Sequence, residues 1–316
     1  MKPAAFTNTT VQFYPKGNPN LRLIALWYFT TLMIVWNILG HTYLGFEQPW
    51  VAPVVGVGTA IFIQLFLDWL DAQARNREVR WTNGVGSFLN SLPPAIIPGF
   101  ACAMLLYPNE RMWPIVFAVV LSLSSKILIR APVGEGRTQH IFNPSNFGVA
   151  ATLVLFPDVG FAPPYHFTEN ITGVWDWIVP GFILLTGVVI HGFFTGRLPL
   201  VAAWLVGFAL QGQIRAQLYG FPPIVPIMPM TSAAFIVFTL YMIPDPATTP
   251  LHKWRQALFG FSVAMIYGWI QMMHWVFGLF FALLAVCAVR GISLYLYHTF
   301  KSRSPNVAMP TPAPAA

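Results

Sequence analysis

Charged residues are nearly absent from this chain, and this feature limits most strongly what it can fold into. Asp, Glu, Lys and Arg make up 9% of its 316 residues, whereas about 25% is usual in a soluble domain. Hydrophobic residues make up 56%, and the mean hydropathy is +0.62. So little charge cannot cover a water-facing surface of this size. We therefore expect an all-α, polytopic integral membrane protein whose first partner is the lipid bilayer.

Apolar stretches recur along the chain at close to the length of about 20 residues that a membrane-spanning helix needs. There are ten of them, at 21–44, 50–70, 85–106, 112–129, 141–156, 175–194, 198–217, 228–243, 256–273 and 275–297. The fifth and eighth are short, which predicts partial or broken helices. The expected organisation is a cytoplasmic segment (1–20), a single membrane domain of ten helices (21–300) and a disordered cytoplasmic tail (301–316).

The basic residues support an orientation for this arrangement. With the N-terminus in the cytoplasm, 15 of the 17 Lys and Arg residues fall on the cytoplasmic side, and the exceptions are Arg111 and Arg215. Such a bias follows the positive-inside rule. It predicts a multi-pass protein of the bacterial cytoplasmic (inner) membrane with both termini in the cytoplasm. The net charge of +7 then reflects orientation, and no nucleic-acid partner is expected.

The ten stretches divide into two halves of five, at about 21–157 and 174–300. An odd number of spans in each half implies opposite orientations, which is the plan of an inverted repeat. Shifting the sequence by 136 residues aligns Pro93 with Pro229 and Pro108 with Pro244. Proline-interrupted spans at matching places of two halves predict where a ligand site would lie.

The first candidate site is the segment RTQHIFNPSNFG, residues 137–148. Asn143 followed by Pro144 has the form of a helix N-cap with proline at the first helical position, so backbone N–H groups would be presented there. Helix N-termini beside basic side chains bind anions. The candidate residues are Lys126, Arg130, Arg137, Asn143, Pro144, Ser145 and Asn146. The alternative is that the basic side chains reach the membrane interface and Asn143 is only a cap.

The second candidate is YMIPDPATTPLHKW, residues 241–254, where Asp245, Thr248 and Thr249 stand among three prolines. A rigid structural turn is the alternative. The third span also carries adjacent prolines, Pro93 and Pro94, and these leave backbone carbonyl groups that need other partners. The two cysteines lie in apolar stretches without a CxxC or a neighbouring histidine, so no metal site is expected.

Two segments together resemble a known family. HIFNPSNFGVAATLVLFP (140–157) and LYMIPDPATTPLHKWRQALFGFSVAMIYG (240–268) resemble the FNPA-xxG and F-M-x-T-D-P-x-T-x-P segments of the RnfD/NqrB family. These are the flavin-carrying membrane subunits of Rnf complexes and Na⁺-translocating NADH:quinone reductases. NPSNFG, SSKILIR (124–130) and ENITGVWDWIVP (169–180) are closest to the UnbU-like branch associated with enediyne biosynthesis clusters.

The resemblance implies a membrane subunit of inverted repeats that takes part in electron transport with redox or complex partner proteins. The family attaches FMN through the threonine of an S-G-A-T motif, and this chain has FPDVGFAPPYHFTENITGVWD (156–176) in that region. No covalent FMN is therefore expected, and a noncovalent FMN or riboflavin is the cofactor that remains. The alternative is a transporter or channel for a small solute or ion on the same scaffold, which the missing motif favours. A third is a scaffold that anchors a biosynthetic enzyme.

Overall fold

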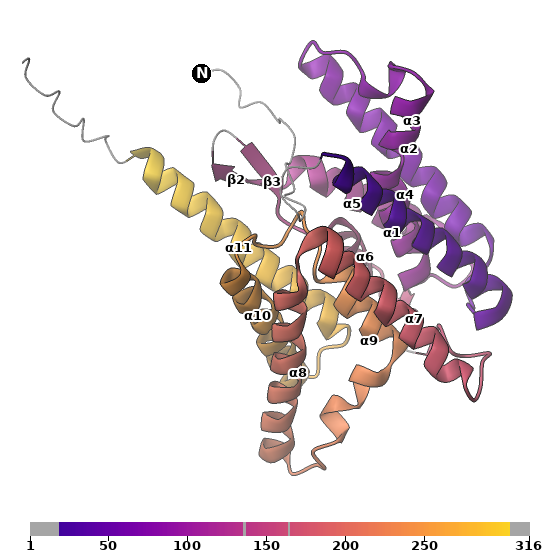
Figure 1. Cartoon of the computed structure of the whole chain (residues 1–316), viewed down its shortest axis with the longest axis vertical. Coiled ribbons are helices and arrows are strands. Elements are labelled where there is room, and N and C mark those ends of the chain that lie inside the picture. Colours follow the sequence, from indigo (N-terminus) through magenta and orange to yellow (C-terminus); the bar gives the residue numbers. More distant parts are fainter. Residues whose placement is uncertain (1–18, 135–136, 164, 304–316) are drawn as a thin grey trace, which may run out of the picture.

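The computed structural model describes residues 19–134, 137–163 and 165–303. The protein is mostly helical (Figure 1). The elements of the first half are α1 (Pro19–Leu39), η1 (Gly40–Leu44), α2 (Val51–Ala74), η2 (Arg80–Thr82), α3 (Val85–Ser91), α4 (Pro93–Leu105), β1 (Leu106–Tyr107), α5 (Trp113–Leu128), β2 (Arg130–Gly134), β3 (Arg137–His140), α6 (Pro144–Leu155) and β4 (Gly160–Phe161). Those of the second half are α7 (Trp175–Val189), η3 (Ile190–Thr195), α8 (Leu198–Tyr219), η4 (Val225–Thr231), α9 (Ala233–Val237), η5 (Phe238–Met242), α10 (Lys253–Met272) and α11 (Gly278–Arg303).

Each of the ten predicted stretches contains helix, but the prediction of ten membrane-spanning helices is wrong. Among the described residues, five helical segments are long and apolar enough to cross a membrane: Leu21–Leu44, Val51–Ala74, Val85–Leu105, Trp175–Thr195 and Gly278–Phe300. The pair Val225–Thr231 and Ala233–Met242, bent by 72°, makes six if it counts as one span. Helices α5 and α6 are too short, at 16 and 12 residues. Helices α8 and α10, at 22 and 20 residues, are long enough but are not among these segments.

The break predicted in the eighth stretch is confirmed, and its cause is local. Pro226 and Pro229 lie in η4, which is a 3₁₀ helix, and proline cannot donate the backbone hydrogen bond that an α-helix requires. Ser232 then takes an extended conformation, and its hydroxyl accepts a hydrogen bond from the Phe235 N–H at 3.2 Å. This N-cap starts α9 in a new direction. The short fifth stretch likewise becomes the short helix α6.

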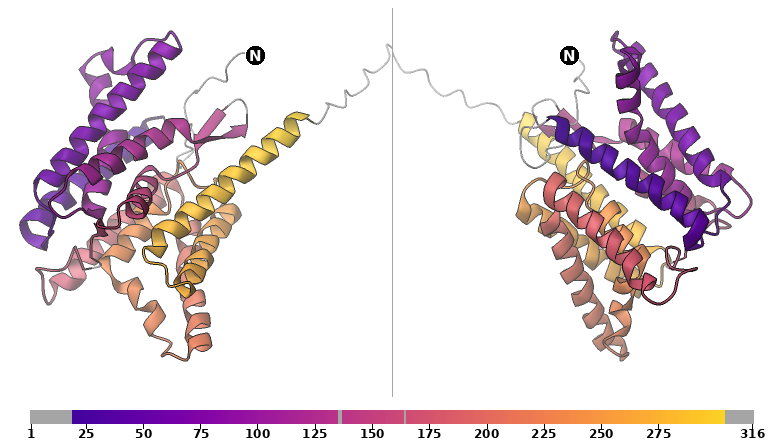
Figure 2. Two further views of the ribbon diagram at one scale, coloured as in Figure 1. Left: turned by 180° about the vertical axis from the view of Figure 1, so that it is seen from behind. Right: turned by 45° about the vertical axis from the view of Figure 1, so that its right-hand side comes forward.

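Small residues allow the helices to approach each other closely. A Cβ on Gly148 of α6 would collide with the Ala118 carbonyl of α5, and one on Gly260 of α10 would collide with the Leu200 carbonyl of α8. Close packing through small residues is the usual means of association in membrane helices. Large buried side chains such as Trp204 fill the remaining core of the second half. The ribbon shows α1–α4 on one side of the molecule and α8–α11 on the other (Figures 1 and 2).

Two short antiparallel pairs join the helices. Strand β1 pairs with β4, and β2 pairs with β3 in a hairpin with a bulge between Pro132 and Gly134. The hairpin lies at the same end of the molecule as the start of α1 and the end of α11 (Figure 2). Of the predicted terminal segments, 1–18 and 304–316 lie outside the described residues. The first three residues of the predicted disordered tail are the helical end of α11.

Candidate functional site

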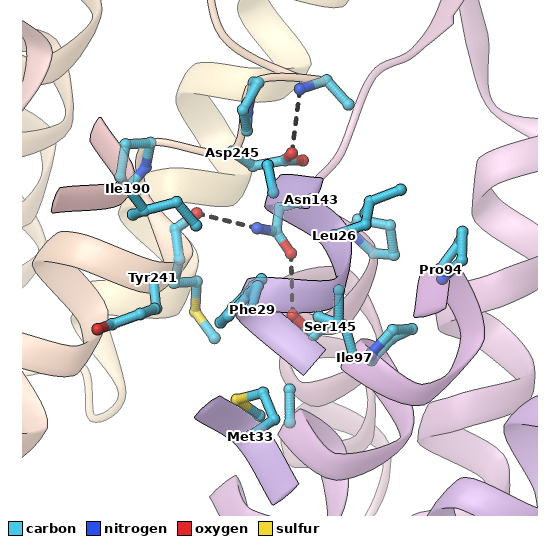
Figure 3. A pocket seen from close by; sticks show the side chains of 18 of the residues that line it. Leu26, Phe29, Met33, Pro94, Ile97, Asn143, Ser145, Ile190, Tyr241 and Asp245 are labelled. Atoms are coloured by element: carbon cyan, nitrogen blue, oxygen red, sulfur yellow. Dashed lines mark hydrogen bonds between the residues drawn. The ribbon is translucent and has the colours of Figure 1, made fainter. Parts of the chain in front are cut away.

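A cavity of about 230 Å³ lies where the two halves meet. Its walls come from α1, α4, the start of α6, η3, η5 and the turn after η5. One part is apolar, with Leu26, Phe29, Met33 and Ile97. Asp245 stands at the opposite end from Met33, and Asn143 lies between them (Figure 3). The cavity therefore has apolar walls and one polar end.

Asn143 occupies the centre of this arrangement because it both caps α6 and ties that helix to the second half. Its Oδ1 accepts hydrogen bonds from the Asn146 N–H at 3.3 Å and from the Ser145 hydroxyl at 2.9 Å. Its Nδ2 donates to the carbonyl of Met242 at 2.9 Å (Figure 3). The predicted N-cap with proline at the first helical position is confirmed. The Asn143 side chain, however, is fully occupied with protein partners.

Asp245 organises the turn that closes the polar end. Its Oδ1 accepts from the Ala247 N–H at 3.0 Å, and its Oδ2 accepts from the Thr248 hydroxyl at 3.1 Å. The Thr249 hydroxyl donates to the Asp245 carbonyl at 2.7 Å. These bonds make Thr248 and Thr249 part of the turn itself, and both are buried. Gln139 of β3 also donates to the Ala247 carbonyl, so the hairpin holds the same turn.

His140 and Asp245 form a partly solvated pair at the edge of the cavity. The imidazole Nε2 lies 3.9 Å from Asp245 Oδ2, with one-tenth and one-fifth of the two side chains exposed. Burial lowers the pKa of His140, so the imidazole is neutral near pH 7 although the carboxylate opposes this shift. Burial raises the pKa of Asp245, but the neighbouring imidazole and the hydrogen bonds from Ala247 and Thr248 outweigh it and hold that pKa below its usual range. Asp245 is therefore an anion at the cavity.

Lys126 donates a hydrogen bond to a backbone carbonyl of α4 that has no donor within its own helix. Its Nζ donates to the Pro94 carbonyl at 3.0 Å. In an α-helix that carbonyl would accept from the N–H four residues later, but residue 98 is also proline and has no N–H. Lys126 supplies the missing donor from α5. The sequence predicted unpaired carbonyl groups from Pro93 and Pro94, whereas the carbonyl that Lys126 bonds is the one left without a donor by Pro98.

The structure divides the ten predicted site residues among several places. Five line the cavity: Lys126, Asn143, Pro144, Ser145 and Asp245. Asn146 is buried beside it, and its Nδ2 donates to the Phe280 carbonyl at 3.1 Å. Arg130 bonds Thr138 and the Lys126 carbonyl, which holds the hairpin against α5. Arg137 lines a second cavity. The three basic residues therefore do not converge on one anion.

Sequence reasoning missed Arg197 as a residue of the site. Arg197, 2% exposed, donates to Thr249 Oγ1 at 2.9 Å and to the Thr195 carbonyl at 2.9 Å, so it locks the Asp245 turn to α8. Burial lowers its pKa to about 10, although the Asp245 carboxylate opposes the shift. His191 lies in the cavity wall and bonds the Leu240 carbonyl, as a core histidine would. In the sequence, Arg197 stands directly before an apolar stretch. The positive-inside rule was a sufficient explanation of that position, so nothing else marked Arg197 as a site residue.

No family model and no curated protein matches this chain. Among the described residues, no group of three or more His, Cys, Asp or Glu side chains could hold a metal ion. The cavity therefore combines apolar walls with one carboxylate, two imidazoles, one ammonium group and one guanidinium group, from Asp245, His140, His191, Lys126 and Arg22. These can bind and orient a small, largely apolar molecule with a polar edge.

Proposed function

We propose that this protein is a membrane subunit of RnfD/NqrB type that takes part in electron transport and holds a flavin noncovalently in the cavity between its halves. One observation carries the proposal. The segments 140–157 and 240–268, which carry the resemblance, meet at a single cavity and are joined there by the hydrogen bond from Asn143 to the Met242 carbonyl. Segments about a hundred residues apart thus supply one site.

The cavity fits the ring of a flavin better than its phosphate. The walls made by Phe29, Met33 and Ile97 suit a flat, largely apolar ring. A volume of about 230 Å³ is below the usual range of about 300–1,000 Å³ for ligand pockets, so the ring would fill it. A phosphate would meet the Asp245 carboxylate, which repels it, and also Lys126 and Arg22, which attract it. Charge therefore does not choose between the two flavins, and it is the small volume that makes us favour riboflavin over FMN, with the sugar chain directed out of the cavity.

The roles of the chain's residues follow from this placement. His140 and Asp245 would face the polar edge of the ring, and Lys126 would place a positive charge near it. Bound flavin supplies one- and two-electron transfer. The protein orients the ring, excludes water from its apolar face and sets the local charge. The electrons would come from redox partner proteins, as the resemblance implies.

The test is the absorption spectrum of the full chain purified in detergent from cells with an intact flavin supply. We expect flavin absorbance near one per chain, and no flavin fluorescence on a denaturing gel. Ile97→Trp should fill the cavity and remove the flavin, whereas Ile24→Trp, on the exposed side of α1, should retain it. Colourless wild-type protein would refute the proposal.

A transporter of a small solute or ion is the second candidate, and one observation favours it. The cavity is lined by both α4 and η5, which belong to the two proline-interrupted spans. We also propose that the two halves are inverted repeats. The helices of the second and fourth stretches pack together in both halves, α2 against α5 and α8 against α10. Transporters bind solutes between such repeats. Colourless protein that moves solute in proteoliposomes, and loses this activity in Ile97→Trp, would favour this candidate.

The proposed setting is the bacterial cytoplasmic membrane with both termini in the cytoplasm. This requires an even number of spans, as when the bent pair Val225–Thr231 and Ala233–Met242 counts as the sixth. The start of α1, which carries Arg22, and the β2–β3 hairpin, which carries Arg130 and Arg137, lie toward one end of the molecule, and this supports the orientation (Figures 1 and 2). An association with enediyne biosynthesis would follow from the UnbU-like resemblance. Deleting the gene in a producing strain and measuring enediyne titre tests it.

A further inference from the structure

A second cavity of about 650 Å³ lies on the other face of the Asp245 turn. It is enclosed by the β2–β3 hairpin, the segment 246–252, α10 and α11, and it shares only Pro246 with the first cavity among the described lining residues. Its volume is typical of a ligand pocket, for which about 300–1,000 Å³ is usual. The proposed electron-transport function does not use it.

The lining of this cavity is strongly basic. Arg137, Arg255 and Arg290 all line it, and they come from the hairpin, α10 and α11 respectively. Within the described residues, no Asp or Glu lines it. Arg290 Nη2 lies 3.5 Å from Gln139 Oε1, which is a weak contact for a guanidinium. Guanidinium groups bind phosphate oxygens in pairs of parallel hydrogen bonds, so this cluster matches a phosphate.

The rest of the lining is largely apolar, and part of it is exposed on the surface. Phe259, Ile266 and Val286 line it, and Leu258 and Val289 at its margin are 57% and 61% exposed. Ile266 lies 11 residues beyond Arg255 on α10, which is about 16 Å along the helix axis. The apolar lining thus begins beside the arginines and extends away from Arg255 along the groove between α10 and α11. Trp254 stands beside Arg255, with the guanidinium carbon 5.1 Å from its ring centroid, as is usual at a membrane interface.

We propose that this cavity binds an anionic phospholipid. The phosphate lies against Arg255 and Arg290, with Arg137 contributing positive potential, and one acyl chain lies along the α10–α11 groove. A soluble phosphate would use the arginines and leave the apolar groove to other lipids, whereas a phospholipid satisfies both parts. The basic end of the groove lies beside the hairpin, so the lipid belongs to the leaflet on that side, which the positive-inside rule makes cytoplasmic.

Native mass spectrometry of the full chain in detergent, titrated with phosphatidylglycerol or phosphatidylcholine of identical acyl chains, tests this site. We expect phosphatidylglycerol to bind at least about tenfold more tightly. Arg255→Gln with Arg290→Gln should abolish this preference. The matched control is Arg215→Gln with Arg111→Gln, which removes the same charge from arginines outside the cavity. It should keep the preference.

A second variant tests the groove without changing any charge. Val289→Trp should fill the apolar part and weaken binding of phosphatidylglycerol, and Val206→Trp, equally exposed on α8, should not. Equal affinity for the two lipids, or a preference that survives the double arginine variant, would overturn the proposal. So would inorganic phosphate that displaces phosphatidylglycerol at equal concentration, because the site would then be one for a small anion.

Discussion

The hydrogen bond from Lys126 to the Pro94 carbonyl allows a sharp test of how this membrane helix tolerates its prolines. Lys126→Met keeps a long side chain but removes the donor, and the carbonyl then has neither its lysine nor the absent N–H of Pro98. A hydrogen bond to a charged group contributes about 1.5–3 kcal/mol, so we expect a loss of that size in the free energy of unfolding. Lys253→Met, an exposed lysine at the start of α10, should change it by less than about 0.5 kcal/mol.

The decisive comparison is made in the Pro98→Ala background. Alanine restores an N–H at residue 98, which can donate to the Pro94 carbonyl as in a regular helix. Lys126→Met should then cost about 1–2 kcal/mol less than it does in the wild-type background. This coupling can be measured by unfolding in mixed micelles with increasing dodecyl sulfate, followed by tryptophan fluorescence.

Equal losses in the two backgrounds would refute the reasoning. Lys126 would then stabilise the protein by packing or by its charge, independently of the carbonyl. The flavin content of the same variants separates two roles of this lysine, because Pro98→Ala can restore stability but cannot restore a positive charge to the cavity. Loss of flavin that persists in the stable double variant would assign Lys126 to ligand binding as well.

Three further outcomes are expected. Gly148→Ala should lower the free energy of unfolding by about 1–3 kcal/mol because its Cβ would strike a carbonyl of α5, whereas Gly58→Ala, with open space around it, should raise it by up to about 1 kcal/mol. Burial lowers the pKa of His166 to about 3. As the pH drops from about 6.5 to 3, the unfolded state therefore binds a proton that the folded state does not, and the free energy of unfolding falls. His166→Phe should reduce the slope of this free energy against pH by about 1.4 kcal/mol per pH unit. The predicted orientation places Glu78 on the cytoplasmic side and Glu110 outside, so Glu78→Cys should react only with cytoplasmic thiol reagents and Glu110→Cys only with external ones. The native thiols are buried and should give no background labelling. Labelling of both variants from one side would contradict the orientation.

Much of the local structure at the site followed from sequence because short-range rules decide it. Asn143–Pro144 predicted a capped helix start, and the cap bond to the Asn146 N–H is present. The prolines of the eighth stretch predicted its break, and the bend of 72° is there. Both features depend on a few consecutive residues, which the sequence displays directly.

The number of membrane-spanning helices did not follow in the same way. Hydropathy along the chain marked ten stretches, but whether a stretch completes a span depends on where the backbone turns. Helix α6 stops at Leu155 after 12 residues, although the apolar stretch that contains it runs from 141 to 156. The apolar composition of a stretch does not show where its helix begins or ends.

The sequence by itself determined the class of this protein, since a chain with 9% charged residues has to place most of its surface in lipid. It also determined the helix caps and breaks. Only the tertiary structure decided which basic residues share a site. Lys126, Arg130 and Arg137 are near one another in sequence, yet they contact a proline carbonyl, the hairpin and a second cavity respectively. The physical reason is that side-chain partners are chosen by the packing of α4, α10 and α11 around them, and these contacts join residues far apart in the chain.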